Sequence, residues 1–186
     1  MKLVILDRDG TINSDSDDFV KTPDEWLPLP GSLEAIARLN HAGWHVVIAS
    51  NQSGLGRGLF DVASLNAMHA KMHKMLAAVG GRVDAVFYCP HSPEESCNCR
   101  KPLPGLFEQI GERFGVPLKG VPTAGDSLRD LQAGAAAGCE PHLVLTGKSA
   151  KGQPDGLPAG TTVHADLAAF ADFILQRAAR PVAVAI

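Results

Sequence analysis

The sequence has few aromatic residues, no excess of positive charge and no long apolar run. Phe, Trp and Tyr make up 5% of its 186 residues, and 17 Lys and Arg face 20 Asp and Glu, which gives a net charge of −3. Nucleic-acid-binding surfaces are typically basic and carry aromatic residues that stack on bases, so we expect no nucleic-acid partner. Because no run approaches the ~20 apolar residues of a membrane-spanning helix, we expect no membrane partner either.

The amino-terminal segment does not predict a signal peptide. Residues 3–6 are apolar, but Asp7 follows too soon for the apolar core of such a peptide. We therefore expect a cytoplasmic protein. A chain of this length buries enough surface to fold without disulfides, and we expect it to act as a monomer.

Cysteine is scarce, yet three of the four cysteines fall within eleven positions, at Cys89, Cys97 and Cys99. In a reducing compartment such a cluster indicates a metal site rather than disulfides, with free thiols as the alternative. With His91, the cluster offers three thiols and one imidazole, which are the ligand types of a tetrahedral zinc site. Four protein ligands leave no open position for catalysis, so we expect structural zinc.

Short apolar segments alternate with amphipathic segments of helical length. The segments that predict strands are 3–6, 45–49, 85–88, 121–124, 142–145 and 161–163, those that predict helices begin near 31, 62, 105, 128 and 165, and those that predict loops are 53–58 and 147–160. Strand and helix in alternation predict a doubly wound, Rossmann-like α/β fold, with a parallel sheet and helices on both faces. We expect one domain over residues 1–178, with a zinc-clamped loop insert at 89–99 and a C-terminal tail at 179–186.

Polar residues follow the predicted strands, where ligands of such folds bind. Asp7 and Asp9 follow the first strand, Ser50 the second, Lys101 the third with its insert, and Asp126 the fourth. Two carboxylates this close require a cation or a proton between them. The sequence therefore predicts a magnesium site in which one aspartate is also a nucleophile, and Asp126 supplies a further acidic ligand. The alternative is a turn with capping aspartates.

Other ion and phosphate motifs do not fit. An EF-hand loop starting at Asp7 requires Gly at its sixth position and Glu at its twelfth, but these are Ile12 and Asp18. Lys148 resembles the lysine of a phosphate-binding P-loop, but His142 stands where that motif requires its first glycine. Both motifs are excluded.

Several residues suit a bound phosphate. Ser50 and Asn51 offer a hydroxyl, an amide and backbone N–H groups at a loop that enters a helix. Lys101 can balance the charge of a nucleophile and a phosphate, and the planar guanidinium of Arg100 can bind a second anionic group.

Three further residues each allow a functional and a purely structural interpretation. Asp130 can orient neighbouring groups or serve as an ordinary acid of a helix's first turn. His69 and His73 are four positions apart on a predicted helix, but Ala70 excludes a zinc-binding HExxH motif. For the two histidines, amphipathic packing is the favoured interpretation.

The ordered motifs DxDGT at residues 7–11, Ser50, Lys101 and GDxxxD at residues 125–130 resemble the haloacid dehalogenase (HAD) superfamily of phosphatases over nearly the whole chain. The resemblance implies that Asp7 attacks phosphorus to form an aspartyl-phosphate. It implies that Asp9 protonates the leaving oxygen and later activates water. It also implies magnesium held by Asp7, the backbone carbonyl of Asp9 and Asp126, with Ser50 and Lys101 binding the phosphoryl group.

A narrower resemblance is to the D-glycero-D-manno-heptose-1,7-bisphosphate 7-phosphatase family. It rests on NQSG at 51–54 with Arg57-Gly58, CPH at 89–91 and CxCRKPxPG at 97–105. It implies a role in ADP-heptose and lipopolysaccharide core biosynthesis. It also implies a domain without a separate cap, in which loops, one of them zinc-clamped, surround a sugar bisphosphate. The substrate-binding residues expected on this basis are Asp15, Asp18, Asn51, Gln52, Ser53, Arg57 and Arg100.

Other functions stay open. Histidinol-phosphate phosphatase shares the same motifs, although the matches at Arg57-Gly58 and at 100–105 favour the heptose family. A module that binds a phosphorylated ligand without turnover is a further alternative, but it would not need an acid at Asp9. A zinc-stabilised interaction protein is another, and it predicts an exposed apolar patch beside the zinc loop. Two departures from the family are the short interval between His91 and Cys97 and the presence of Ser127 where a lysine is common.

Overall fold

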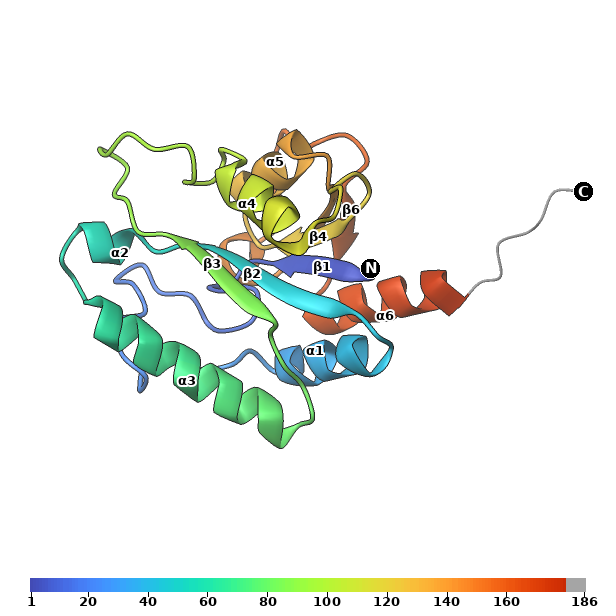
Figure 1. The fold of residues 1–186 in the computed structure, drawn as a ribbon, viewed down its shortest axis with the longest axis horizontal. Coiled ribbons are helices and arrows are strands. Elements are labelled where there is room, and N and C mark those ends of the chain that lie inside the picture. Colours follow the sequence, from blue (N-terminus) through green and yellow to red (C-terminus); the bar gives the residue numbers. More distant parts are fainter. Residues whose placement is uncertain (180–186) are drawn as a thin grey trace, which may run out of the picture.

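A six-stranded parallel sheet organises the computed structural model, which describes residues 1–179. The strands lie in the order β3-β2-β1-β4-β5-β6, as the doubly wound prediction requires (Figure 1). The strands are β1 (Leu3–Leu6), β2 (His45–Asn51), β3 (Ala85–Cys89), β4 (Pro122–Gly125), β5 (Glu140–Val144) and β6 (Thr162–His164). The helices are α1 (Ser32–His41), α2 (Ser53–Gly56), α3 (Val62–Ala78), α4 (Gly105–Phe114), α5 (Leu128–Ala136) and α6 (Leu167–Ala179), with a 3-10 turn, η1 (Gly147–Ser149).

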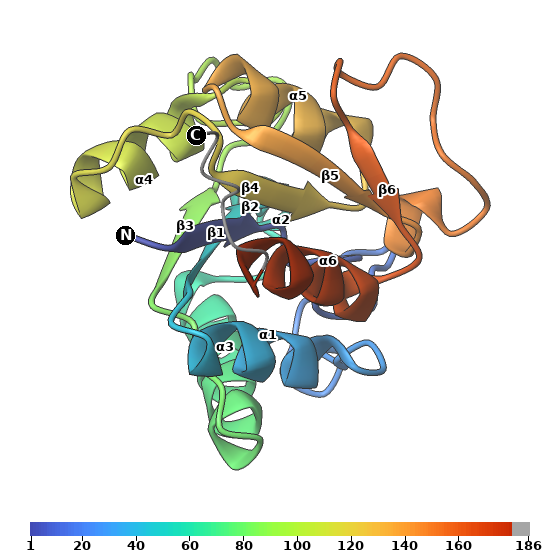
Figure 2. The same cartoon turned by 90° about the vertical axis from the view of Figure 1, so that its right-hand side faces the viewer.

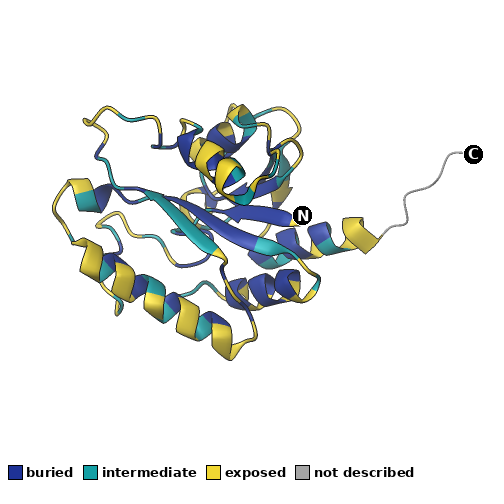
Figure 3. Cartoon of the chain, viewed as in Figure 1, coloured by how far each residue is buried: buried dark blue, intermediate teal, exposed yellow. Residues whose placement is uncertain are grey.

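Helices cover both faces of the sheet. Helices α1, α3 and α6 lie on one side and α4 and α5 on the other (Figures 1 and 2). All four residues of β1 are buried, and they alternate between two apolar clusters: Val4 and Leu6 pack in the cluster with α1 and α3, whereas Leu3 and Ile5 pack in the cluster with α4. A strand covered on both faces needs apolar residues at every position, and Figure 3 shows this buried centre.

The register of the sheet brings three strand ends together. Leu6, the last residue of β1, pairs with Ile48 of β2 and with Ala124 of β4. The order of the strands reverses at β1, where a doubly wound sheet leaves a crevice at its carboxyl edge. The residues that follow β1, β2 and β4 therefore meet at one place.

No cap domain interrupts the described residues. The segment between β1 and α1 contains no helix or strand beyond isolated bridges, and the insert between β3 and α4 is the cysteine-rich loop. The structure thus confirms the expected α/β architecture without a cap. The tail predicted at 179–186 lies outside the described residues apart from its first position. No helix among the residues described combines the length and apolar character that a bilayer crossing needs.

Two predicted loops contain helical turns, so the loop assignment there was wrong. Residues 53–56 form α2, and residues 147–149 form η1. Gly54 explains the first case: a Cβ there would lie 2.3 Å from the ring of Phe60. A side chain at residue 54 would displace this ring, so the glycine that suggests a loop there instead serves close packing.

A pair of buried histidines lies on β5 and β6, at the edge of the sheet opposite β3. His142 of β5 is 0% exposed, and its Nδ1 lies 2.9 Å from Nε2 of His164 on β6. The two rings pack against Phe170 and Phe173 of α6. Burial lowers the pKa of His142 from 6.5 to about 4, so this side chain is neutral in the folded protein at neutral pH.

This burial predicts a loss of stability in mild acid. Below about pH 6.5 the unfolded chain binds a proton at His142 that the folded chain excludes until about pH 4, so the free energy of unfolding should fall as the pH falls through that range. We expect a decrease of roughly 1 to 2 kcal/mol between pH 7 and pH 5 from this group. Urea denaturation at both pH values would measure it. The variant His142→Phe should lose less stability over the same interval than the wild type, and an equal loss would refute the assignment.

Candidate active site

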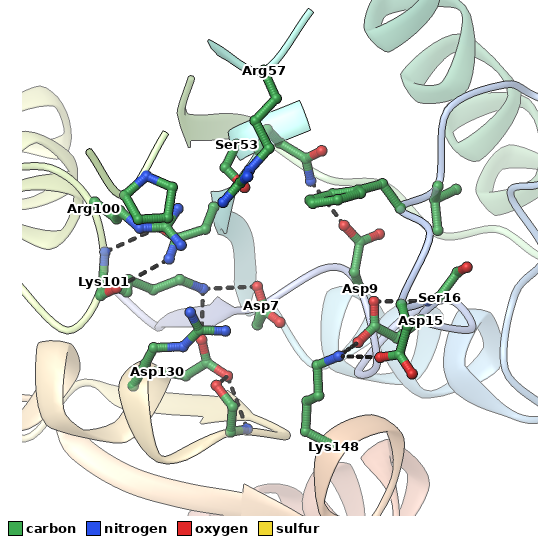
Figure 4. A pocket seen from close by; sticks show the side chains of 18 residues that line it. Asp7, Asp9, Asp15, Ser16, Ser53, Arg57, Arg100, Lys101, Asp130 and Lys148 are labelled. Carbon is green, nitrogen blue, oxygen red and sulfur yellow. Dashed lines mark hydrogen bonds and ion pairs between the residues drawn. The ribbon is translucent and has the colours of Figure 1, made fainter. Parts of the chain in front are cut away.

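A buried lysine joins the strand ends. The Nζ of Lys101 lies 2.7 Å from Oδ1 of Asp7, 2.7 Å from Oδ1 of Asp130 and 2.7 Å from the carbonyl oxygen of Ala49 (Figure 4). Lys101 is 2% exposed. Burial alone would lower the pKa of Lys101, but the carboxylates of Asp130 and Asp7 outweigh it and raise the pKa, so the ammonium is charged.

Three carboxylates crowd this lysine. Oxygens of Asp7, Asp126 and Asp130 lie within 4.8 Å of one another. Burial, together with the neighbouring carboxylate of Asp130, raises the pKa of Asp7 from 3.8 to about 7. Burial and then the charges of Asp7 and Asp130 raise the pKa of Asp126 to about 9. One ammonium does not offset three carboxylates, so without a cation Asp126 keeps a proton at neutral pH. An all-oxygen donor set of this kind suits a magnesium ion, which would replace that proton.

Two glycines allow the chain to approach Asp126. A Cβ at Gly10 would lie 2.2 Å from Oδ2 of Asp126, and one at Gly147 would lie 2.1 Å from the same atom. Both glycines also have positive φ, of 88° and 50°. The backbone N–H of Lys148 donates to the same Oδ2 at 2.6 Å. The glycine of the DxDGT motif is therefore required by this close contact.

Asp9 is held apart from the carboxylate cluster by four hydrogen bonds. Arg8 donates from Nε to its Oδ1 at 2.9 Å and from Nη2 to its Oδ2 at 3.0 Å. Asn13 donates to Oδ1 at 2.8 Å, and Gln52 donates to Oδ2 at 2.9 Å. Figure 4 places Asp9 on the side of Asp15 and Ser16, away from Lys101.

The residues at the carboxyl end of β2 hold Lys101 and Asp9 in place. The Nε2 of Gln52 also donates to Oγ of the buried Ser50 at 2.8 Å, so it bridges Ser50 and Asp9. Asn51 exchanges two hydrogen bonds with the backbone of Lys101, at 3.1 and 3.0 Å. Asn51 and Gln52 thus tie β2 to both the lysine and Asp9.

Above these groups lies an open cavity of about 390 Å³. Its lining includes Asp7 and Asp9 at the bottom, and most of the residues expected to bind substrate. Those residues are Asp15, Asn51, Gln52, Ser53, Arg57 and Arg100. Asp18, which is exposed, does not line the cavity, and neither does Ser50, which is buried.

Residues that the sequence analysis missed complete the cavity. Arg129, in the first turn of α5, joins Arg57 and Arg100 in the lining. Burial, then the nearby guanidinium of Arg129, lowers the pKa of Arg100, which reflects the concentration of positive charge. Lys148 reaches across to the loop after β1, with its Nζ 3.0 Å from Asp15. Arg129 had one available signal, its position in the turn that follows Asp126, but nothing in sequence spacing predicts Lys148 here.

The cysteine-rich loop forms a compact cluster of ligand atoms. The Nδ1 of His91 lies 3.3 Å from Sγ of Cys89 and 3.3 Å from Sγ of Cys99, and the sulfurs of Cys89 and Cys97 are 3.8 Å apart. A zinc ion with Zn–S bonds of about 2.3 Å places its sulfur ligands about 3.8 Å apart in a tetrahedron. The four cysteines are free of disulfides, so the cluster fits zinc in both donor type and spacing.

Known proteins share both the sequence and the fold. A HAD-hydrolase-like family model matches residues 98–170. The D-glycero-β-D-manno-heptose-1,7-bisphosphate 7-phosphatase of Bordetella bronchiseptica is 63% identical over 179 residues, which cover 96% of this chain and 100% of that protein. The protein with the same name from Pseudomonas aeruginosa is 54% identical over 94% of this chain and 98% of its own length.

Two solved structures have a fold similar to that of this chain. The crystal structure of the B. bronchiseptica D,D-heptose 1,7-bisphosphate phosphatase, complexed with magnesium and phosphate, superposes with a TM-score of 0.93, covering 95% of this chain and 99% of that one. The enzyme of the same description from Burkholderia thailandensis is 57% identical with a TM-score of 0.75, covering 94% and 99%. With relatives of this identity matched over almost their whole length, the chain belongs to the heptose-1,7-bisphosphate 7-phosphatase family of HAD-like hydrolases.

Proposed function

We propose that the protein is a magnesium-dependent phosphatase that removes the 7-phosphate of D-glycero-D-manno-heptose 1,7-bisphosphate, in the cytoplasmic synthesis of the ADP-heptose used for the lipopolysaccharide core. The observation that carries the proposal is the group of Asp7, Lys101 and Asp126, because Asp7 and Lys101 line a cavity whose lining also holds three arginines. Such a cavity suits a substrate with two separate phosphates. The names of the relatives support this substrate.

The donor set supports magnesium. Asp7 and Asp126, together with the backbone carbonyl of Asp9, would hold the ion, and Asp130 lies close enough to orient the group. When bound, magnesium would neutralise charge on the phosphate oxygens and on the carboxylates. The relative crystallised with magnesium and phosphate adds support.

The reaction assigned to these residues has two steps. First, a carboxylate oxygen of Asp7 attacks phosphorus, the bond to the sugar oxygen breaks, and that oxygen takes a proton from Asp9. Then water attacks the phosphorus of the aspartyl-phosphate and gives a proton to Asp9, which releases inorganic phosphate and restores Asp7. The ammonium of Lys101, 2.7 Å from Asp7, offsets the charge that the two groups bring together, and Ser50 donates to the phosphoryl group.

The cavity lining supports recognition of a sugar bisphosphate. Arg57, Arg100 and Arg129 are suited to the phosphate that is not cleaved, because guanidinium groups bind phosphate oxygens in pairs. Asp15, Asn51, Gln52 and Ser53 are suited to sugar hydroxyls. For Asp18 this role would require a movement of its loop, because Asp18 lies outside the cavity.

Zinc in the cysteine-rich loop would be structural. Cys89, His91, Cys97 and Cys99 supply all four ligands of a tetrahedral ion, which leaves no open position for a substrate. Burial raises the pKa of Cys89 to about 12, so without a cation this thiol stays protonated, and a metal is what would make it a thiolate. We propose that the enzyme acts as a monomer.

The variant Asp7→Asn should abolish turnover while leaving the fold intact. An amide cannot attack phosphorus, so we expect kcat to fall by about 10³-fold or more. Because the change removes one of three crowded carboxylates, thermal melting should show no loss of stability. Phosphate release would be measured beside Asp24→Asn, an exposed aspartate outside the site, which should behave as wild type. Retained turnover in Asp7→Asn would refute the mechanism.

Substrate choice is tested by measuring phosphate release from heptose 1,7-bisphosphate and from histidinol phosphate, side by side with magnesium. Because three arginines line the cavity, kcat/KM should favour the bisphosphate by about 10²-fold or more, which corresponds to one well-bound phosphate. Arg100→Ala should lower the ratio of kcat/KM for the bisphosphate to kcat/KM for histidinol phosphate. A preference for histidinol phosphate, which has a single phosphate, would contradict the proposed substrate.

Loss of a zinc ligand should weaken the cysteine-rich loop. Cys97→Ser should lower the zinc content, measured by elemental mass spectrometry, from one ion per chain to a small fraction, and should speed proteolysis within residues 89–99. Cys139→Ser is the matched control, because Cys139 is a buried free thiol that is not among the four clustered ligands, and zinc content should be unchanged. Wild-type protein that binds no zinc and keeps full stability would overturn the assignment.

A further inference from the structure

Arg8 is a buried charge whose partners are few and specific. It lies between the nucleophile and the acid in sequence and is 0% exposed. Its Nε and Nη2 both donate to Asp9, and Asp9 is the one carboxylate that pairs with it among residues 1–179. A guanidinium is planar, so the plane that Arg8 adopts fixes the direction in which Asp9 can lie.

The third group on Arg8 is a histidine from a distant helix. Nη1 of Arg8 lies 3.1 Å from Nε2 of His69, which stands on α3. Arginine has no acceptor atom, so Arg8 must donate and Nε2 of His69 must accept. Burial, and then the charge of Arg8, lower the pKa of His69 from 6.5 to about 4, which agrees with a neutral ring whose Nε2 is free of a proton.

We propose that His69 is a positioning residue for the general acid: it accepts a hydrogen bond from Arg8 and thereby fixes the guanidinium plane that orients Asp9. His69 is outside the cavity lining and would touch neither substrate nor metal. His69 acts on Asp9 indirectly: it contacts Arg8, and Arg8 in turn contacts Asp9. The amphipathic spacing of His69 on α3 explains why it is partly buried, but not why it meets Arg8, the one arginine that is buried within residues 1–179.

This inference rests on the proposed phosphatase activity, in which Asp9 protonates the leaving oxygen. A misplaced acid slows only reactions that need the proton. A sugar alkoxide is a poor leaving group and needs protonation, whereas p-nitrophenolate leaves without it. In kcat/KM, which reports the steps up to formation of the aspartyl-phosphate, a defect in positioning should therefore affect the two substrates differently.

The experiment compares kcat/KM of His69→Ala for heptose 1,7-bisphosphate and for p-nitrophenyl phosphate. We expect a loss of about tenfold on the sugar substrate, part of the about 10² to 10⁴-fold that a general acid contributes, and at most about twofold on the aryl substrate. The loss should lie in kcat, with KM unchanged. His69→Gln should recover most of the activity, because its amide oxygen can accept from Arg8 near the position of Nε2.

His73→Ala is the matched control. It removes an exposed histidine one turn further along α3 and should change neither rate. Equal losses of His69→Ala on both substrates, or no recovery in His69→Gln with an unchanged melting temperature, would overturn the inference. A wild-type protein that hydrolyses neither substrate would instead refute the proposed function itself.

Discussion

The structure depends on the ion pairs of one buried lysine. Lys101 is enclosed by the protein, yet it is held 2.7 Å from both Asp7 and Asp130. A buried ammonium without partners would lose its proton, and buried carboxylates without a cation would gain one. The ammonium of Lys101 therefore stays charged because of its carboxylate partners, and leaving it with no such partner would cost about 3 to 5 kcal/mol. The raised pKa values of Asp7 and Asp126 mean that a divalent cation would stabilise their charged forms.

The sheet makes this concentration of charge possible. Asp7 follows β1, Asp126 follows β4, and the carbonyl oxygen that accepts from Lys101 belongs to Ala49 of β2. Parallel strands in register end at the same edge, so residues far apart in sequence meet without any special loop. The fully buried β1 then fixes Asp7, because its four residues alternate between the apolar clusters on the two faces of the sheet. Asp7 is thus placed by a strand of the buried core.

The sequence predicts the features that follow from local patterns and from the rule that parallel strands end at one edge. Strands, helices and strand-end residues were predictable because apolar periodicity gives the elements, and the fold rule gives the edge where Asp7, Asp126 and Lys101 meet. The cysteine cluster was predictable from its donor types and spacing. Arg129 was missed although it stands in the turn that follows Asp126, and Lys148 was not predictable because its approach to the cavity depends on how its loop folds in three dimensions. His69 was interpreted as packing alone for the same reason: its contact with Arg8 joins two segments that no local pattern relates.

The cysteine-rich loop and the carboxylate site are directly connected along the chain. Cys99 is followed directly by Arg100 and Lys101, so the last cysteine of the cluster lies two residues from the buried lysine. Asn51 ties the backbone of Lys101 to β2 through two hydrogen bonds. The loop packs tightly against the start of α4, because a Cβ at Gly105 would lie only 2.3 Å from the carbonyl oxygen of Asn98. A metal in this loop would therefore do more than order a surface segment, because it would fix the chain from which both the lysine beside the nucleophile and an arginine of the cavity project.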